Sequence, residues 1–235
     1  IEKKATVYEH LQKAIDFSMN HLGPHGLPAG LQNGIFQVAN LFIQAGVNTF
    51  DATMVAGNSA AANADALLYD SMAAFYTACS SFIAQNFGAR KKKRILQTYL
   101  ICLFYSFITS LVLGVGIYLA RYPFLYLFTS DKAVVEAGIT RLSIMALSYS
   151  ASAFMDASIA ASRGLGKTAV PTFVVVMGSC VFRIIWIYTI FAYFHTIQSL
   201  YILYVFSWGI TAIAENIYFF HVYRHTLTGK TESHL

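Results

Sequence analysis

Residues 30–51, GLQNGIFQVANLFIQAGVNTFD, are long enough to cross a membrane as one helix, yet six of their polar side chains recur at helical spacing. At about 100° per residue these six fall within an arc of about 80° on one side of the helix. Such a helix needs lipid on one side and water or protein on the other. We therefore expect the polar side to line a cavity inside a membrane protein. Five amides form this amide stripe, which Asp51 ends: Asn33, Gln37, Asn40, Gln44 and Asn48.

The composition places the whole chain in a membrane. Of its 235 residues 57% are hydrophobic and 11% are charged, whereas soluble domains carry roughly 25% charged residues. Apolar segments recur along the chain as they do in a polytopic membrane protein. We expect an all-α fold, a bundle of six transmembrane helices, near residues 30–50, 58–86, 95–120, 142–162, 169–194 and 197–223.

The loops indicate how the bundle lies in the membrane. Residues 88–94, GARKKKR, carry five positive charges, and in all twelve Lys and Arg residues fall on that side. The alternate loops hold only Arg121, Lys132 and Arg141. The positive-inside rule therefore predicts that both termini are cytoplasmic, in a plasma or inner membrane. The net charge of +5 thus belongs to segment ends, which argues against a nucleic-acid partner.

These segments divide the chain into three parts. We interpret residues 1–28 as a cytoplasmic amphipathic linker, residues 29–224 as the transmembrane lobe and residues 225–235 as a cytoplasmic tail. The chain begins with Ile rather than Met, so we expect it to be a piece of a longer protein.

The second segment combines small residues with polar ones. Residues 55–66, VAGNSAAANADA, are nearly all small, which lets neighbouring helices approach closely. Asp70 is a candidate for a role in the cavity, as a weaker ion site, or for an interhelical hydrogen bond. Asp65 lies about 140° away from Asp70 and nearer the outer surface. Asp70 belongs to a second polar stripe made of Asn63, Asp70, Thr77, Ser81 and Gln85.

The fourth segment carries the strongest candidate site. Tyr149, Ser152, Asp156 and Arg163 fall within about 60° on one face. A carboxylate inside a membrane is costly unless it is hydrated, paired or protonated, so Asp156 is a candidate Na⁺ or proton site. The structural alternative is a satisfied contact between helices. We place residues 121–141 in an external connection, in which Asp131 is a candidate N-cap.

The fifth and sixth segments supply Arg183 and Glu215. Their depths below the cytoplasmic surface differ by roughly 7–10 Å, within reach of two long side chains on antiparallel neighbours. We predict a structural ion pair between them, with a role in ion coupling as the alternative.

The sequence contains no pattern that indicates an enzyme or a bound cofactor. Residues 163–168, RGLGKT, lack the first glycine and the preceding strand of a phosphate-binding loop, and neither HExxH nor CxxC occurs. Cys79, Cys102 and Cys180 each lie in an apolar segment, which argues against a disulfide or metal site.

Several motifs resemble the second lobe of the multidrug and toxic compound extrusion (MATE) transporters. The sequence Gly-Leu-Pro-Ala-Gly of residues 26–30 resembles the opening of that lobe, and Val55-Ala56 the opening of its next helix. Ile-Ala-Gln-Asn-Phe-Gly-Ala-Arg, residues 83–90, resembles the end of that next helix. Met155-Asp156-Ala157 and the loop 163–167 are similar to the tenth helix of the family and its following loop. The similarity covers nearly the whole chain after residue 23.

The resemblance implies one half of a twelve-helix transporter that works by alternating access. Such proteins export organic cations and other amphipathic compounds, drugs or metabolites, against an inward flow of Na⁺ or protons. It implies an N-terminal six-helix lobe as the partner of this chain. Asp156 matches the membrane-embedded acid of the tenth helix. Related members carry a carboxylate on the seventh helix near the position of Phe36, where this chain has only the neighbouring Gln37.

Two other functions fit the pattern less well. A lipid-linked oligosaccharide flippase of the same superfamily would present more Arg and Lys toward the cavity, where the sequence predicts only Arg183 at depth. A membrane scaffold that transports nothing would not explain the polar stripes.

Overall fold

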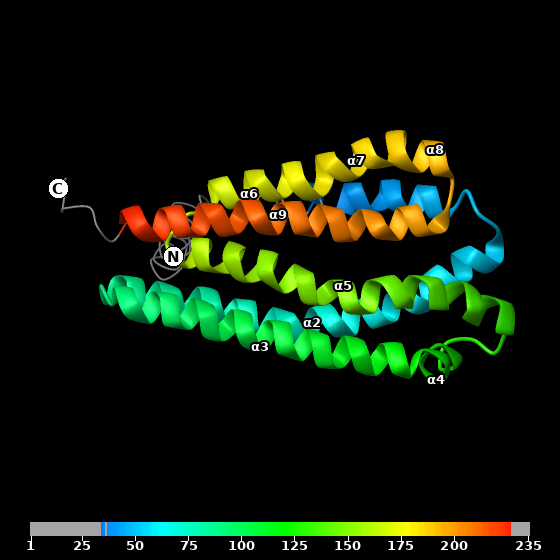
Figure 1. Ribbon diagram of the computed structural model, residues 1–235, viewed down its shortest axis with the longest axis horizontal. Coiled ribbons are helices and arrows are strands. Elements are labelled where there is room, and N and C mark those ends of the chain that lie inside the picture. Colours follow the sequence, from blue (N-terminus) through cyan, green and yellow to red (C-terminus); the bar gives the residue numbers. More distant parts are fainter. Residues whose placement is uncertain (1–33, 36, 227–235) are drawn as a thin grey trace, which may run out of the picture.

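The computed structural model describes residues 34–35 and 37–226, and all of their regular structure is helical (Figure 1). The predicted all-α class is therefore confirmed. The first helix covers residues 37–47. The others are α2 Ala52–Gly88, α3 Lys92–Leu119, α4 Arg121–Tyr126, α5 Lys132–Gly164, α6 Ala169–Val175, η1 Val176–Val181, α7 Phe182–Trp186, η2 Ile187–Phe191, α8 Ala192–Phe194 and α9 Ile197–Thr226.

Four of these segments are long and apolar enough to cross a membrane: Lys92–Leu119, Lys132–Gly164, Ala169–Phe194 and Ile197–His225. The third runs without a break from α6 to α8 and contains two π-helical turns, η1 and η2. Helix α2 has the length of a span, but its small and polar residues lower its hydropathy.

One predicted boundary is wrong, because the fourth long helix begins ten residues earlier than expected. Asp131 caps α5 by accepting a hydrogen bond from the backbone N–H of Ala133 at 2.8 Å, as the sequence predicts. The helix then continues through Arg141, which the sequence places in an external connection. The first turns of α5 have an apolar face, and Val135 on it is buried. Lys132, Glu136 and Arg141 interrupt the apolar pattern of these turns in the sequence, so the start of the helix was not recognised.

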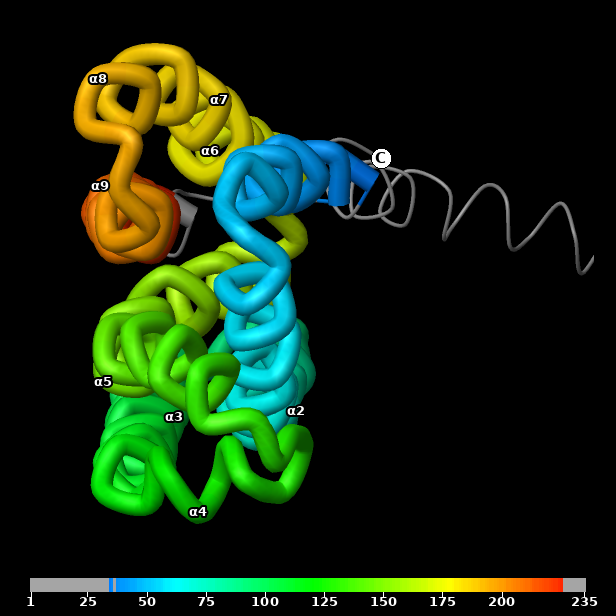
Figure 2. Tube along the Cα trace, turned by 90° about the vertical axis from the view of Figure 1, so that its right-hand side faces the viewer, coloured from blue at the N-terminus to red at the C-terminus, as the bar shows by residue number. Residues whose placement is uncertain are grey.

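The helices form two layers (Figures 1 and 2). One layer holds the first helix, the α6–α8 span and α9. The other holds α2, α3 and α5, with α4 at one end. Helix α5 contacts α2, α3 and α9, so it joins the two layers.

Glycines let α5 lie directly against its neighbours. A Cβ added to Gly57 of α2 would meet the backbone N of Gly138 on α5 at 2.7 Å. A Cβ added to Gly114 of α3 would meet the carbonyl oxygen of Ala146 at 2.1 Å. The packing of α2 and α3 on α5 therefore depends on residues without a side chain at these crossings.

The helix ends bring the basic loops together. The loop after α2, the loop after α5 and the last turn of α9 lie at the same end of the molecule (Figure 1). This end carries the run 90–94 together with Lys167 and Arg224. The predicted linker 1–28 lies outside the described residues, as do residues 227–235 of the predicted tail.

Candidate functional site

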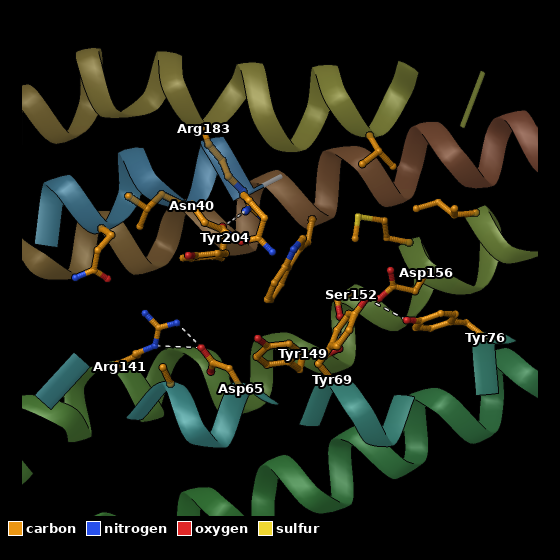
Figure 3. Close-up of a pocket in the computed structure, with 18 of the residues that line it drawn as sticks. Asn40, Asp65, Tyr69, Tyr76, Arg141, Tyr149, Ser152, Asp156, Arg183 and Tyr204 are labelled. Carbon is orange, nitrogen blue, oxygen red and sulfur yellow. Dashed lines mark hydrogen bonds and ion pairs between the residues drawn. The ribbon is translucent and has the colours of Figure 1, made fainter. Parts of the chain in front are cut away.

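A cavity of about 800 Å³ lies between the two layers (Figure 3). Its wall comes from the first helix, α2, α5, the α6–α8 span and α9, so residues far apart in the sequence meet there. The lining mixes amides, aromatic rings and charges. Its charged residues are Asp65, Asp156, Arg141, Arg163 and Arg183.

The amide stripe forms one side of this cavity. Gln37, Asn40 and Gln44 line it, as the periodicity of the first helix predicts. Gln44 donates a hydrogen bond to Asn48 Oδ1 at 2.9 Å. Asn48 itself is exposed and does not line the cavity, which corrects the prediction for this residue. Asn33 lies outside the described residues.

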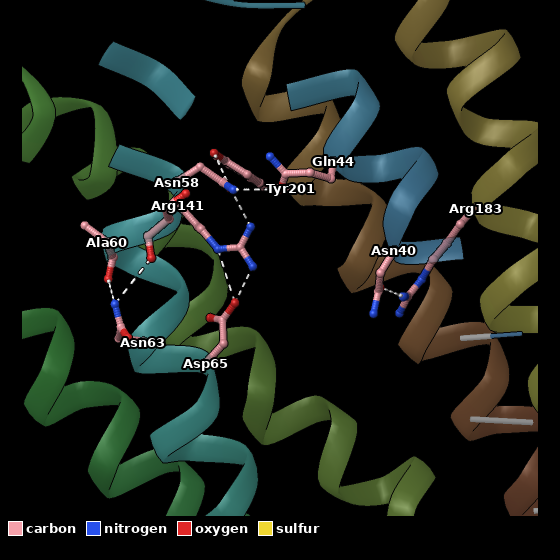
Figure 4. A network of polar contacts seen from close by, with 10 residues as sticks. Asn40, Gln44, Asn58, Ala60, Asn63, Asp65, Arg141, Arg183 and Tyr201 are labelled. Carbon is pink, nitrogen blue, oxygen red and sulfur yellow. Dashed lines mark hydrogen bonds and ion pairs between the residues drawn. The ribbon is translucent and has the colours of Figure 1, made fainter. Parts of the chain in front are cut away.

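A network of polar contacts at one end of the cavity joins α2, α5 and α9 (Figure 4). Arg141 forms an ion pair with Asp65 and donates from Nη1 to Asn58 Oδ1 at 2.7 Å. The Tyr201 hydroxyl donates to the same Asn58 oxygen at 3.1 Å. Asn58 in turn donates to Gln44 Oε1 at 3.4 Å, which ties the network to the amide stripe.

Arg183 of α7 lies in the opposite layer, where it lines the cavity and is buried against α9 and the first helix. It donates to Ser207 Oγ at 3.2 Å and to Asn40 Oδ1 at 3.3 Å. Its guanidinium also lies 4.6 Å from the centre of the Tyr204 ring, a cation–π distance. These contacts hold a positive charge against the amide stripe.

Asp156 and Arg163 lie together on the α5 face predicted from the sequence. Both line the cavity, with Tyr149 and Ser152 on the same face. Asp156 is half-buried and lines the cavity. The seven residues from Asp156 to Arg163 span about 10 Å along the helix.

Aromatic rings complete the wall. Tyr149 and Trp208 lie 4.9 Å apart between ring centres, and Tyr204 lies 5.5 Å from Trp208. Tyr69 and Tyr76 of α2 join through a hydroxyl–hydroxyl contact of 3.0 Å near Asp156 (Figure 3). Rings of this kind bind flat apolar groups and organic cations.

The second polar stripe does not face the cavity, which corrects the prediction for two candidate residues. Asn63 is exposed on the outside of α2 and donates to the carbonyls of Ser59 and Ala60 on its own helix. Asp70 is also exposed and does not line the cavity. The face of α2 that packs on α5 buries Ala61, Ala64, Leu68 and Met72, and this packing turns the stripe outward.

The predicted ion pair between Arg183 and Glu215 does not form in the described part of the chain. Neither carboxylate oxygen of Glu215 accepts a hydrogen bond from the residues described. Arg183 contacts α9 at Ser207, eight residues before Glu215, which is about 12 Å along the helix. The sequence therefore underestimated the difference in depth between Arg183 and Glu215 below the cytoplasmic surface.

Sequence reasoning missed several residues of the cavity. Asp65 and Arg141 stand out among them, because the sequence assigned Asp65 no role and placed Arg141 in an external loop. A signal was present in α2, where five lining residues recur at helical spacings of three, four and seven. These five are Asn58, Ala62, Asp65, Tyr69 and Tyr76.

The family of the chain follows from a match over most of its length. The sequence profile of the MatE family matches residues 28–189. The chain belongs to the MatE family. No curated protein matches the chain.

Solved MATE structures share the fold. A mutant of the MATE transporter VcmN from Vibrio cholerae superposes with a TM-score of 0.80 at 20% identity, over 91% of this chain and 49% of its own. A transporter of the MOP superfamily from Pyrococcus furiosus, described by the reverse polarity of its binding pocket, gives 0.79 at 20% identity, over 87% and 46%. An outward-facing multidrug resistance MATE transporter gives 0.77 at 20% identity, over 86% and 46%. This MatE chain spans about half the length of these transporters and has the fold of one half.

Proposed function

We propose that this chain is the second lobe of an antiporter that exports amphipathic organic compounds and is driven by an inward flow of Na⁺ or protons. The observation that carries the proposal is Asp156, a half-buried carboxyl group that opens into an 800 Å³ cavity lined by aromatic rings and amides. Membership of the MatE family and the half-length match to its transporters support the two-lobe architecture. The other lobe would close the cavity from the opposite side.

Asp156 supplies the coupling step in this proposal. An ionised carboxylate facing a wet cavity attracts Na⁺ or takes up a proton, and its neutralisation removes the cost of enclosing a buried charge. The bound ion thereby shifts the balance between conformations that open to either side. The amide stripe and the Tyr149–Trp208 pair contact the substrate. Because these groups recognise general shape and polarity, the substrate selectivity is broad.

The basic end of the bundle sets the orientation that we propose. Lys and Arg between residues 90 and 94 would lie in the cytoplasm together with Lys167 and Arg224. Residues 29–224 would then form the membrane lobe in a plasma or inner membrane. Residues 1–28 would be a cytoplasmic linker, and residues 225–235 a cytoplasmic tail.

A second candidate substrate class is favoured by the charges of the cavity. The sequence predicted one deep arginine, but Arg141, Arg163 and Arg183 all line the wall. Three guanidinium groups against two carboxylates suit an amphipathic anion, including the pyrophosphate of a lipid-linked sugar. The profile match supports an exporter of the MatE family over such a flippase.

Blocking the cavity tests the proposal. Ala62 lines the cavity from α2, and Trp at this position would fill it. Cells that express the full-length protein with Ala62→Trp should retain more ethidium than cells with the unchanged protein. Val112→Trp, on the 64% exposed Val112 of α3, is the control and should export normally. Equal ethidium export by the Ala62→Trp protein would refute the role of the cavity, and loss of export for an anionic dye alone would favour the second candidate.

A further inference from the structure

The last turns of α9 carry two histidines that the proposed transport does not use. His221 and His225 are both exposed, and their ring centres lie 4.4 Å apart with the ring planes tilted by 45°. They are four residues apart on the continuous helix Ile197–Thr226, so they lie on one side of it, about 40° apart. Imidazole is the commonest metal ligand in proteins, and two histidines at this spacing on one helix face can bind the same ion.

The packing of α9 fixes the direction in which the pair faces. Phe219 and Val222 are buried, at 0% and 6% exposure, in an apolar cluster with residues of α2, α3 and α5. The Phe219 ring lies against the ring of Tyr99 on α3, with 4.4 Å between their centres. A rotation of α9 that turned the histidines inward would expose these apolar side chains. The pair is therefore held on the outer side of the helix, at the basic end of the bundle.

The nearest lysine in contact with this part of α9 lies on its far side. Lys92 Nζ is 5.4 Å from the centre of the Tyr223 ring, and the Tyr223 hydroxyl donates to the Lys92 carbonyl oxygen at 3.4 Å. Tyr223 is about 160° around the helix from each histidine. The width of the helix therefore weakens the repulsion between Lys92 and a metal ion at the pair. Arg224, about 60° from His221 and 100° from His225, is itself exposed, so its long side chain has room to turn away.

The separation of the two rings suits a shared metal ion. A Zn²⁺ ion lies about 2.0–2.1 Å from a coordinating imidazole nitrogen and therefore roughly 3.2 Å from the ring centre. Two rings that bind one ion at about 90–110° to each other then have centres about 4.5–5.2 Å apart. The observed 4.4 Å lies at the near edge of this range. Rotation of the two exposed side chains is enough to aim one nitrogen of each at the same point, and the backbone need not move.

We propose that His221 and His225 bind one divalent transition-metal ion of the Zn²⁺ type. In the described part of the chain no third histidine, cysteine or acid joins the pair, so water fills the remaining coordination positions. Imidazole suits Zn²⁺, Cu²⁺ and Ni²⁺, whereas Mg²⁺ and Ca²⁺ prefer oxygen ligands. The two nitrogens meet only when residues 221–225 are helical, so the bound ion stabilises the end of α9. Neither histidine lines the cavity, and the site does not depend on the proposed function.

Metal titration of the full-length protein tests the site. The protein is purified in detergent without a histidine tag, and Cu²⁺ is the probe because it binds nitrogen ligands more tightly than Zn²⁺ does. The electron paramagnetic resonance spectrum should show Cu²⁺ bound by two imidazole nitrogens, and Zn²⁺ should displace it. His221→Gln or His225→Gln alone should remove this signal and lower the affinity for Cu²⁺ at least about tenfold, because binding by one imidazole raises the effective concentration of the other.

A matched control lies at the opposite end of the bundle, where His195 is exposed and has no second histidine four residues away (Figure 1). The His195→Gln protein should give the same two-nitrogen signal and the same affinity as the unchanged protein. A single variant of the pair that keeps the two-nitrogen signal, or whose affinity stays within about twofold of the unchanged protein, would overturn the proposal, because the histidines would then not act together.

A second measurement needs no variant. Diethyl pyrocarbonate modifies imidazole nitrogens that are free of metal, and mass spectrometry locates the modified residues. Increasing Zn²⁺ should protect His221 and His225 together, over the same range of concentration, and should leave His195 open to modification. Protection of only one member of the pair, or of His195 at the same Zn²⁺ concentration, would contradict a shared ion.

Discussion

Asp65 and Arg141 form the ion pair that holds one end of the cavity, and their surroundings show how a charged pair is tolerated there. Both side chains are at most 14% exposed. Arg141 also donates to Asn58, and its guanidinium lies 5.4 Å from the centre of the Tyr201 ring. The pair and its contacts therefore join α2, α5 and α9 at one end of the cavity.

Removing one partner of this pair should lower the free energy of unfolding more than removing both. Asp65→Leu leaves a buried guanidinium without its carboxylate and should lower the free energy of unfolding by about 3–5 kcal/mol. Arg141→Met alone should act similarly, whereas the double variant should recover most of the loss because no uncompensated charge remains. Chemical unfolding of the full-length protein in detergent measures all three. Losses that simply add in the double variant would show that the two residues do not act as a pair.

At the scale of the helix, α5 is the element on which the lobe is assembled. It contacts α2, α3 and α9 and contributes Arg141, Tyr149, Asp156 and Arg163 to the cavity. Its neighbours approach closely because glycine occupies the crossings. The site thus depends on backbone contacts that lie outside the cavity.

A methyl group at one such crossing should disturb α5, while the same change nearby should not. Gly114→Ala places Cβ 2.1 Å from the carbonyl oxygen of Ala146, so the helices must separate at a cost of about 1–3 kcal/mol. Gly116, one half-turn away on α3, has open space where its Cβ would lie. Gly116→Ala should be neutral or stabilising by up to about 1 kcal/mol, because alanine favours the helix. Thermal unfolding of both proteins checks this, and equal melting temperatures would contradict the close packing of α3 on α5.

The elements show which parts of the site the sequence could predict. The amide stripe was predictable because the first helix carries polar residues on a single side. Helix α2 carries two polar faces, and periodicity alone could not choose between the face of Asp65 and that of Asp70. The choice is made by Leu68 and Met72, which pack on the core and leave Asp65 inward. Arg141 was missed because charges in the first turns of α5 resemble a loop.

At the scale of the molecule, the outward position of the second polar stripe fits a chain that is half of its relatives. Asn63, Asp70, Thr77, Ser81 and Gln85 are exposed on α2. Polar side chains and a carboxylate on a membrane helix face protein or water rather than lipid. We expect this face of α2 to lie against the other half of the transporter or a wet gap beside it.

Spin labels can locate this face in the full-length protein. A nitroxide on Thr77→Cys should show low collision with oxygen, which concentrates in lipid. A nitroxide on Val112→Cys, on the exposed apolar face of α3, should show high collision. The three cysteines of this chain are buried, so they should add little background labelling. Equal and high oxygen collision at both positions would place the stripe in lipid and refute this expectation.

The most direct test of the account compares two aspartates that the sequence offered as the stronger and the weaker candidate ion site and that the structure places on different sides of the lobe. Asp156 lines the cavity, and Asp70 lies outside it. The full-length protein is reconstituted in liposomes, and ethidium transport is measured under imposed Na⁺ and pH gradients. We predict that Asp156→Asn abolishes the dependence of transport on the gradient and that Asp70→Asn preserves it. Gradient-driven transport that survives Asp156→Asn would contradict the central claim that this cavity carries the coupling site.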